Sequence, residues 1–334
     1  MSQALSYEVR LYRPGDEHAI LEAFNRIFAR VDPTFRPRTL EEWRWQYERN
    51  PSGRRIFLAV AEDGRVLAQY AGIPQRMLLD GQPGSFSQSV DSMSDPDHRR
   101  LAREPLFVQV GRPFDAYFGA DAPDKDTLMW GLPVPPAFRI GKKSLKYELI
   151  RQQHKLVADL AHLSLRASAL SAEELQRFPP EMDALSVRAA GERRAIAVRD
   201  RVQMAWRYEE NPYHRYRIAV VRRAGELEGM TVFRRGGFDQ CEDGLVVDWL
   251  APAGDEEVRT ALLAWLVAAA REEGCERLTA LFPDTAREWL AFQRLGFRVR
   301  ATRYFLVAWS FSVPRNLPWM RRHWYYTLGD TDLA

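Results

Sequence analysis

The chain has 334 residues, of which 46% are hydrophobic and 28% are charged. This ordinary globular composition excludes a wholly disordered, collagen-like or coiled-coil protein, and at about 100–200 residues per domain two domains are expected. The 48 lysines and arginines nearly balance the 45 aspartates and glutamates, so the charge gives no reason to expect a nucleic acid as partner.

The cysteines and the apolar stretches bear on location. Two cysteines, Cys241 and Cys275, are too few for a disulfide framework or a cysteine-rich zinc module, which fits a reducing compartment. The beginning of the chain contains Glu8, Asp16 and Glu17 and no apolar run, unlike a secretory signal. The most apolar stretch, residues 261–270, is far shorter than the ~20 residues that span a bilayer. We therefore expect a cytoplasmic protein that does not enter membranes.

The first half of the chain alternates between strand and helix patterns. Apolar residues at every second position predict strands, and apolar residues at helical spacing predict helices. The expected strands cover residues 7–12, 56–61, 65–77, 85–93, 128–131 and 145–160. The expected helices cover residues 16–28, 101–118 and 136–144. The order is typical of an α/β (α+β) domain over residues 1–160.

A polar connector, residues 161–180, separates this half from the next. Ser171 and Glu174 have the spacing of a capping box, which predicts a short helix that Pro179 and Pro180 would end. The second half starts near Glu181 and is expected to extend over residues 181–310, followed by a tail over residues 311–334. The basic and aromatic part of that tail, residues 319–326, is expected to dock on its own domain.

The two halves repeat each other. Trp45, Tyr47, Glu48, Asn50 and Pro51 recur 161 residues later as Trp206, Tyr208, Glu209, Asn211 and Pro212. A strand, a turn and a strand follow each copy. Because tryptophan and tyrosine are rare, the sequence predicts a duplicated unit. We expect the shared aromatic residues to pack in the two cores, although a substrate platform is the alternative.

Several segments resemble the GNAT acyltransferase family. The opening Arg10–Asp16 is similar to the family's first strand and turn, and residues 90–100 resemble its cofactor-binding segment. Residues 286–297 resemble its late helix-to-strand segment, and residues 140–147 are a looser match. The resemblance implies two tandem GNAT-like domains, each a mostly antiparallel central sheet flanked by helices. It also implies an acyl-CoA-dependent N-acyltransferase that takes acetyl-CoA or another acyl-CoA.

The resemblance places the acyl-CoA site at the loop that follows residue 91. Backbone N–H groups at the start of a helix, together with the helix dipole, favour a pyrophosphate. The residues assigned to this site are Met93, Ser94, Arg99, Arg100, Ala102, Arg103 and Glu104. Glu104 departs from the family pattern, because its carboxylate stands where a small residue would let the backbone approach the phosphates. In the second half, Asp255, Glu256 and Glu257 would cap a helix and repel phosphates, so we expect that half to have lost the site.

The resemblance also suggests catalytic residues. Asp91 is the candidate base that would deprotonate the acceptor amine, and a hydrogen-bonded structural aspartate is the alternative. The family's tyrosine on the late helix is missing, because the matched positions hold Phe292 and Lys142. The departures leave a second reading open: a non-catalytic binding or scaffold protein that no longer binds CoA.

Other classes of site lack their patterns. The six histidines show no metal-ligand spacing, and neither a Gly-x-Ser-x-Gly elbow nor a P-loop is present. We therefore expect no metal. The resemblance implies an amine of a small molecule, an amino sugar or an amino-acid derivative as acceptor. The sequence leaves the oligomeric state open.

Overall fold

The computed structural model describes residues 6–32, 34–98, 104–163, 165–239 and 241–333. These residues form two compact units. Unit 1 contains Met1–Arg76, Gly84–Leu149 and Leu306–Asn316, and unit 2 contains Met77–Pro83, Ile150–Phe305 and Leu317–Ala334. The predicted domains follow the sequence repeat, whereas these two units are defined by which residues pack together. The predicted bounds, residues 1–160, 161–180, 181–310 and 311–334, therefore stay a prediction.

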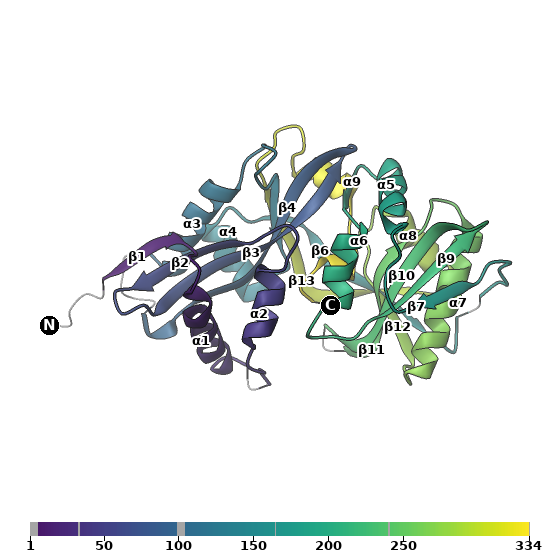
Figure 1. Cartoon of the computed structure of the whole chain (residues 1–334), viewed down its shortest axis with the longest axis horizontal. Helices are drawn as coiled ribbons and strands as arrows, with labels where there is room; N and C mark the ends of the chain where they lie inside the picture. Colours follow the sequence, from purple (N-terminus) through teal and green to yellow (C-terminus); the bar gives the residue numbers. More distant parts are fainter. Residues whose placement is uncertain (1–5, 33, 99–103, 164, 240, 334) are drawn as a thin grey trace. The chain divides into compact units, whose positions relative to one another are not determined.

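Unit 1 is a mostly antiparallel sheet with helices on both faces (Figure 1). Its strands follow the order β1-β2-β3-β4-β5, and only β4 and β5 pair in parallel. The strands are β1 (Tyr7–Leu11), β2 (Arg55–Ala61), β3 (Val66–Leu79), β4 (Gln82–Ser94) and β5 (Leu128–Gly131). The end of β3 and the start of β4, within Met77–Pro83, belong to unit 2, where β3 pairs with β8 (Ala195–Ala197). The helices are α1 (Asp16–Ala29), α2 (Leu40–Tyr47), α3 (Leu106–Phe118) and α4 (Pro135–Ser144), with a 3₁₀ turn over Pro96–His98.

Two apolar layers hold this sheet. On one face, α1 and α2 bury a cluster that includes Phe24, Trp43 and Met93. On the other face, the Tyr70 ring lies 5.3 Å from that of Phe107 on α3, centroid to centroid. Both faces of the sheet are therefore covered, which explains why its central strands contain so few charged residues.

Unit 2 repeats this plan with additions. Its strands are β6 (Glu148–Asp159), β7 (Ala172–Leu175), β8 (Ala195–Ala197), β9 (Arg217–Arg223), β10 (Glu226–Phe238), β11 (Cys241–Leu250), β12 (Arg277–Ala280), β13 (Arg298–Ser310) and β14 (Trp324–Tyr325). Its helices are α5 (Met182–Glu192), α6 (Arg201–Met204), α7 (Glu256–Glu272), α8 (Arg287–Arg294) and α9 (Leu317–His323). A π-helical turn covers Ala205–Glu209, and a 3₁₀ turn, η3, covers Leu328–Asp330. The order β6-β12-β11-β10-β9-β7 makes this sheet the counterpart of that in unit 1.

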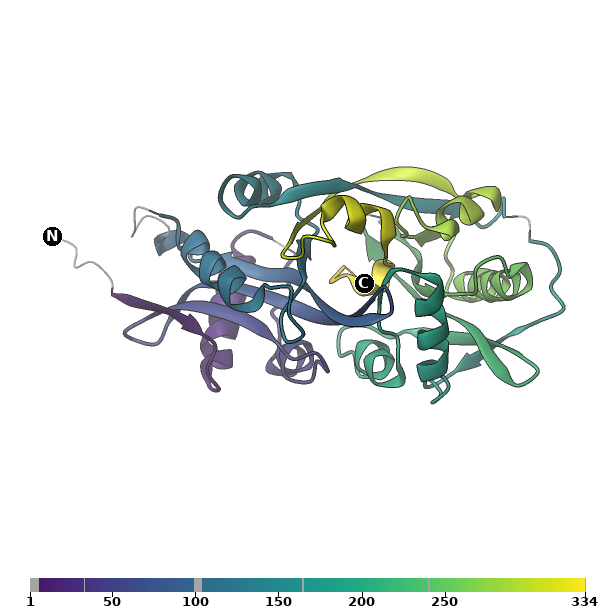
Figure 2. The same cartoon turned by 90° about the horizontal axis from the view of Figure 1, so that it is seen from above.

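Strands β6 and β13 prevent either sheet from being built from one continuous stretch of sequence. β6 follows α4 in the sequence but pairs with β12 inside unit 2. The end of β13, Val307–Ser310, pairs with β5 inside unit 1. Figure 2 shows β6, in teal, and β13, in yellow-green, side by side.

Most predicted elements are confirmed, and one is wrong. The strand predicted over residues 128–131 has those bounds, and the helix predicted over residues 16–28 is one residue longer. The capping-box helix near Ser171 is instead strand β7, which extends the sheet antiparallel to β9. Glu174 does not cap a helix there, because its carboxylate accepts two hydrogen bonds from the Arg217 guanidinium, at 2.9 and 2.6 Å. A long-range ion pair thus overrides a local signal.

Candidate functional site

The candidate base Asp91 lies in a dense polar cluster of unit 1. It is on β4 at φ 51°, a left-handed conformation that is unusual for a residue other than glycine. Its carboxylate accepts hydrogen bonds from both terminal nitrogens of Arg38, from Gln46 Nε2 at 2.9 Å and from Tyr47 Oη at 2.6 Å. The Asp91 side chain is only 11% exposed. All three side chains that hold this carboxylate therefore come from α2 and from Arg38, two residues before its first residue.

The environment of Asp91 makes it a weak base. Burial alone would raise its pKa, but the charge of Arg38 and the hydrogen bonds from Arg38, Tyr47 and Gln46 outweigh burial and lower it. A carboxylate with a lowered pKa and several filled hydrogen-bond positions binds a further proton poorly. The geometry therefore favours a structural aspartate, and catalysis by Asp91 stays a prediction.

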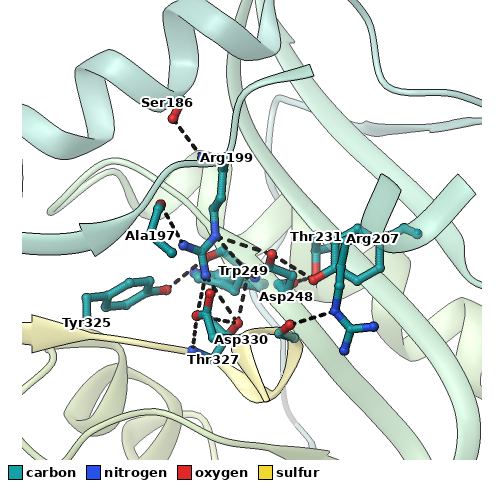
Figure 3. A network of polar contacts seen from close by, with 12 residues as sticks. Ser186, Ala197, Arg199, Arg207, Thr231, Asp248, Trp249, Tyr325, Thr327 and Asp330 are labelled. Atoms are coloured by element: carbon teal, nitrogen blue, oxygen red, sulfur yellow. Dashed lines mark hydrogen bonds and ion pairs between the residues drawn. The ribbon is translucent and has the colours of Figure 1, made fainter. Parts of the chain in front are cut away.

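Unit 2 contains the same arrangement around Asp248 (Figure 3). Arg199 Nε donates to both carboxylate oxygens of Asp248, at 3.0 and 3.2 Å, and Tyr208 Oη donates at 2.9 Å. Arg199 also donates from Nη2 to Asp330 at 2.7 Å. Burial opposes the charge of Arg199, but the two carboxylates outweigh it and raise its pKa. For Asp330, burial and then the charge of Asp248 raise the pKa above its usual range.

The two clusters contain the same arrangement, in which an arginine and a tyrosine donate hydrogen bonds to an aspartate. Arg38 and Arg199 are 161 residues apart, the same offset as Tyr47 and Tyr208. Neither arginine was predicted from the sequence, although the repeat extends backward to them in the same register. In each copy the residue after the arginine caps a helix: Thr39 accepts from the Glu42 N–H and Asp200 accepts from the Gln203 N–H. Tyr47 and Tyr208 are almost fully buried, so the expectation that these shared aromatic residues pack in the cores is confirmed.

An opening between parallel strands is the second shared feature. In unit 1, β4 pairs with β5 only at Phe86–Gln88, yet β4 continues to Ser94. In unit 2, β11 pairs with β12 only over Gly244–Val246, yet β11 continues to Leu250. Where parallel strands diverge, the backbone of the longer strand can bond to something other than a strand.

In unit 2 the chain's own C-terminal segment fills this opening. Tyr325 Oη donates to the Trp249 carbonyl at 2.7 Å, and Thr327 Oγ1 donates to Asp248 at 3.0 Å. Arg207 donates to the carbonyls of Gly329 and Thr331, which places the C-terminus beside α6 (Figure 1). The tail thus docks on unit 2, which confirms the prediction that it packs on its own domain.

The loop after β11 is closed as well. The Ala253 N–H donates to the Glu192 carboxylate at 2.8 Å. Asp255 caps α7 by accepting from the Val258 N–H, and the Arg223 guanidinium pairs with it. Carboxylates thus occupy amides of this loop that a phosphate would need. The loss of an acyl-CoA site from the second half stays a prediction.

The predicted acyl-CoA residues of unit 1 fall into two groups. Arg99, Arg100, Ala102 and Arg103 lie outside the described residues. Of the others, Met93 belongs to the core cluster under α1 and α2, so its side chain is not available to a ligand. The buried Ser94 Oγ has no hydrogen-bond partner among the described residues, as expected of a group that a ligand could satisfy.

Glu104 lies just before α3 and pairs with a cation of that helix. Arg112 Nη1 is 2.7 Å from Glu104 Oε1, and the Glu104 carbonyl accepts from Gln109 Nε2 at 2.9 Å. Both charged side chains are exposed, so the ion pair adds little stability. It does offset part of the negative charge at the start of α3.

The residues at the family's tyrosine position have no catalytic geometry. Phe292 on α8 is fully buried, and its ring packs against those of Trp249, Phe282 and Phe297. Lys142 on α4 is exposed. In the part of the chain that the structure describes, no cluster of histidine, cysteine or acidic residues could hold a metal ion. No helix in those same residues is long and apolar enough to cross a membrane.

Comparisons with known proteins agree with this fold. Residues 8–103 match the profile of the acetyltransferase (GNAT) domain family. No curated protein sequence matches the chain. Three solved structures of similar fold each cover at least 91% of the chain.

The first structure is a conserved protein of unknown function from Enterococcus faecalis V583, called a probable N-acyltransferase; it is 10% identical, with a TM-score of 0.66 and 73% of its own chain covered. The second is N-myristoyltransferase from Saccharomyces cerevisiae with bound myristoyl-CoA, at 11% identity, a TM-score of 0.54 and 82% of its chain covered. The third is a tandem GNAT protein from the clavulanic acid biosynthesis pathway, at 14% identity, a TM-score of 0.54 and 99% of its chain covered. Residues 8–103 thus match a GNAT domain, and the solved structures show that the whole chain has the fold of a tandem GNAT-like protein.

Proposed function

We propose that the chain is an acyl-CoA-dependent N-acyltransferase, in the simplest case an N-acetyltransferase, and that unit 1 holds the acyl-CoA. The observation that carries the proposal is the contrast between the two strand openings. In unit 2 the tail and Glu192 take the backbone groups beside β11. In unit 1, β4 continues past β5, and Ser94 Oγ at its end is buried without a hydrogen-bond partner among the described residues.

The acceptor follows from the chemistry of the family. An amine of a small molecule, an amino sugar or an amino-acid derivative would attack the thioester, with loss of CoA as the thiol. The reaction requires loss of a proton from the amine and gain of one by the thiolate. We place the reaction in the cytoplasm, where acyl-CoA is available and where two unpaired cysteines, Cys241 and Cys275, would stay reduced.

One set of observations favours the alternative, a non-catalytic binding or scaffold protein. Phe292 is a core residue, and Glu104 places a carboxylate at the start of α3. The alternative predicts that acetyl-CoA does not bind. A rise in melting temperature with acetyl-CoA would exclude it, because a ligand that binds only the folded state stabilises that state.

Glu104→Gly should tighten CoA binding. Removing the charge removes repulsion worth ~1 kcal/mol, or about fivefold in Kd, and removing the side chain lets backbone N–H groups approach the pyrophosphate. Glu104→Gln removes only the charge and should gain less. Arg99→Ala should weaken binding. Arg112→Ala should also weaken it, because it leaves Glu104 without its partner. Calorimetric titration of CoA into the five proteins is the measurement, and equal affinities, or no binding at all, would exclude this loop as the site.

Asp91→Asn separates the two roles of that residue. As a base, Asp91 acts on the amine, so the substitution should lower kcat and leave the Kd for CoA unchanged. As a structural group, Asp91 balances Arg38, so the substitution should lower the melting temperature. Gln46→Ala is the matched control, since it removes one hydrogen bond to Asp91 and no charge. A variant with normal stability and normal kcat would contradict both roles.

A further inference from the structure

A small pocket of unit 2 lies at the start of α8. Its volume is about 170 Å³, and its lining includes Arg193, Arg194, Arg287, Arg322, Glu192 and Glu288. Four guanidinium groups therefore meet two carboxylates. The pocket is in a different unit from the acyl-CoA site proposed above, and its argument does not depend on that proposal.

The excess positive charge is carried by two of the arginines. Arg193 pairs with Glu288 at 2.7 Å, and Arg194 pairs with Asp80 at 2.6 Å. Arg287 and Arg322 are exposed, and neither forms an ion pair with any residue that the structure describes. The imidazole of His323, which also lines the pocket, is affected by this positive charge. Burial and then the charges of Arg194 and Arg322 lower its pKa. The pocket thus has a positive potential that the fold leaves uncompensated.

Two further groups need an acceptor. The N-cap residue of α8, Ala286, provides no side-chain hydrogen bond, and its carbonyl accepts from the third N–H of the helix, that of Trp289, at 3.2 Å. The N–H groups of Arg287 and Glu288 at the start of this eight-residue helix are therefore the ones that an anion would meet. The Arg193 side chain is only 11% exposed. Its Nη2 donates to Glu288 and to the Ala251 carbonyl, but the buried Nη1 has no hydrogen-bond partner among the described residues. The nearest carboxylate oxygen to Nη1, Glu192 Oε2, is 3.7 Å away, beyond hydrogen-bond length.

We propose that this pocket binds the phosphate group of a small phosphorylated molecule. A phosphate carries up to two negative charges and several acceptor oxygens. It can therefore accept from the first turn of α8 and from Arg193 while it balances Arg287 and Arg322. A carboxylate would offer fewer acceptors and half the charge, so it fits this donor set less well.

The experiment is titration of inorganic phosphate into the whole chain without CoA, at constant ionic strength, followed by ³¹P NMR line broadening and by calorimetry. Phosphate should bind to one site. The double variant Arg287→Ala/Arg322→Ala should weaken binding at least about tenfold, because two charge-assisted contacts are lost. Both residues are exposed and outside any described ion pair, so the variant should fold normally.

The matched control is Arg298→Ala/Arg300→Ala, which removes two exposed arginines of β13 away from the pocket lining. This control should bind phosphate as the natural chain does. The proposal is overturned if the natural chain binds no phosphate at millimolar concentration, if both double variants weaken binding equally, or if acetate binds as tightly as phosphate. CoA titrations of the same proteins test the proposed function separately, because none of these substitutions touches unit 1.

Discussion

Arg199→Met should lower the free energy of unfolding of unit 2 by about 3–5 kcal/mol, because it removes the shared partner of two buried carboxylates. Arg199 is 3% exposed and bonds to Asp248 and Asp330, which are almost as buried. Without the guanidinium, the two acids must either repel each other or take up a proton. The pKa of Asp330 is already raised by burial and by the charge of Asp248, so we expect Asp330 to take up a proton.

The loss should appear in the segments that Arg199 ties together. Hydrogen exchange should become faster in peptides from β11 and from residues 324–331, because Thr327 and Asp330 bridge the tail to Arg199 and Asp248 (Figure 3). Urea denaturation followed by tryptophan fluorescence measures the size of the effect. Trp249, next to Asp248 and nearly fully buried, is a reporter within the cluster.

Three variants make the interpretation specific. Arg38→Met removes the equivalent cation of unit 1, but Asp91 keeps Tyr47 and Gln46 and is more exposed, so the loss should be smaller. Arg199→Met combined with Asp248→Asn and Asp330→Asn should recover part of the stability, since no charge is left buried. Arg298→Met, at an exposed position of β13, should change stability by no more than about 0.5 kcal/mol. A loss for Arg199→Met no larger than that of Arg298→Met would contradict a stabilising role for the cluster.

The repeat was readable from the sequence because it is carried by side chains with few substitutes. A buried tyrosine that donates to a buried aspartate cannot be exchanged without leaving a polar group unpaired. Tyr47 and Tyr208 therefore stand out at a fixed offset. Arg38 and Arg199 are equally hard to replace, because each pairs with a buried aspartate. Arginine is a common surface residue, however, so two arginines 161 residues apart do not by themselves indicate a repeat.

What the sequence could not predict depends on long-range contacts. From the sequence, Glu174 is predicted to cap a helix, but in the structure it forms an ion pair with Arg217 that joins β7 to β9. The closing of the unit 2 opening depends on Tyr325, which lies 76 residues after its acceptor Trp249. The pairing of β6 with β12 in unit 2, and of the end of β13 with β5 in unit 1, also joins segments that are far apart in the sequence. Local patterns indicate most of the strands and helices, but pairing partners, and the strand β7, come from the whole fold.

A buried carboxyl on α3 gives the second large expected effect. Burial raises the pKa of Asp115 to about 7, while the nearby Trp309 indole and the charge of Lys146 oppose the rise. Asp115 Oδ1 is buried without a hydrogen-bond partner among the described residues. Around it lie the rings of unit 1: Tyr147 stacks on Trp309 with centroids 4.9 Å apart, and its hydroxyl is 2.9 Å from that of Tyr70.

The sign of the pH effect follows from where the proton is held. Below the ordinary pKa of 3.8 the carboxyl is protonated in both the folded and the unfolded chain. Between 3.8 and about 7 the folded state keeps a proton that the unfolded state releases, so the free energy of unfolding falls as pH rises. The contribution is fully present below the unfolded pKa and is lost by about pH 7, and it amounts to about 4 kcal/mol in total.

Asp115→Asn should remove this dependence. An amide of nearly the same shape carries no charge at any pH, so the difference in unfolding free energy between the variant and the natural chain should shift in favour of the variant by about 4 kcal/mol from pH 4 to pH 7.5. The difference should then stay level at higher pH. Urea denaturation at each pH is the measurement, and taking the difference cancels the other titrating groups. Asp124→Asn, at a carboxylate that is 81% exposed, is the matched control and should give a flat difference. A flat difference for Asp115→Asn, or one that shifts in favour of the natural chain, would mean that the Asp115 carboxylate is charged and compensated in the folded protein.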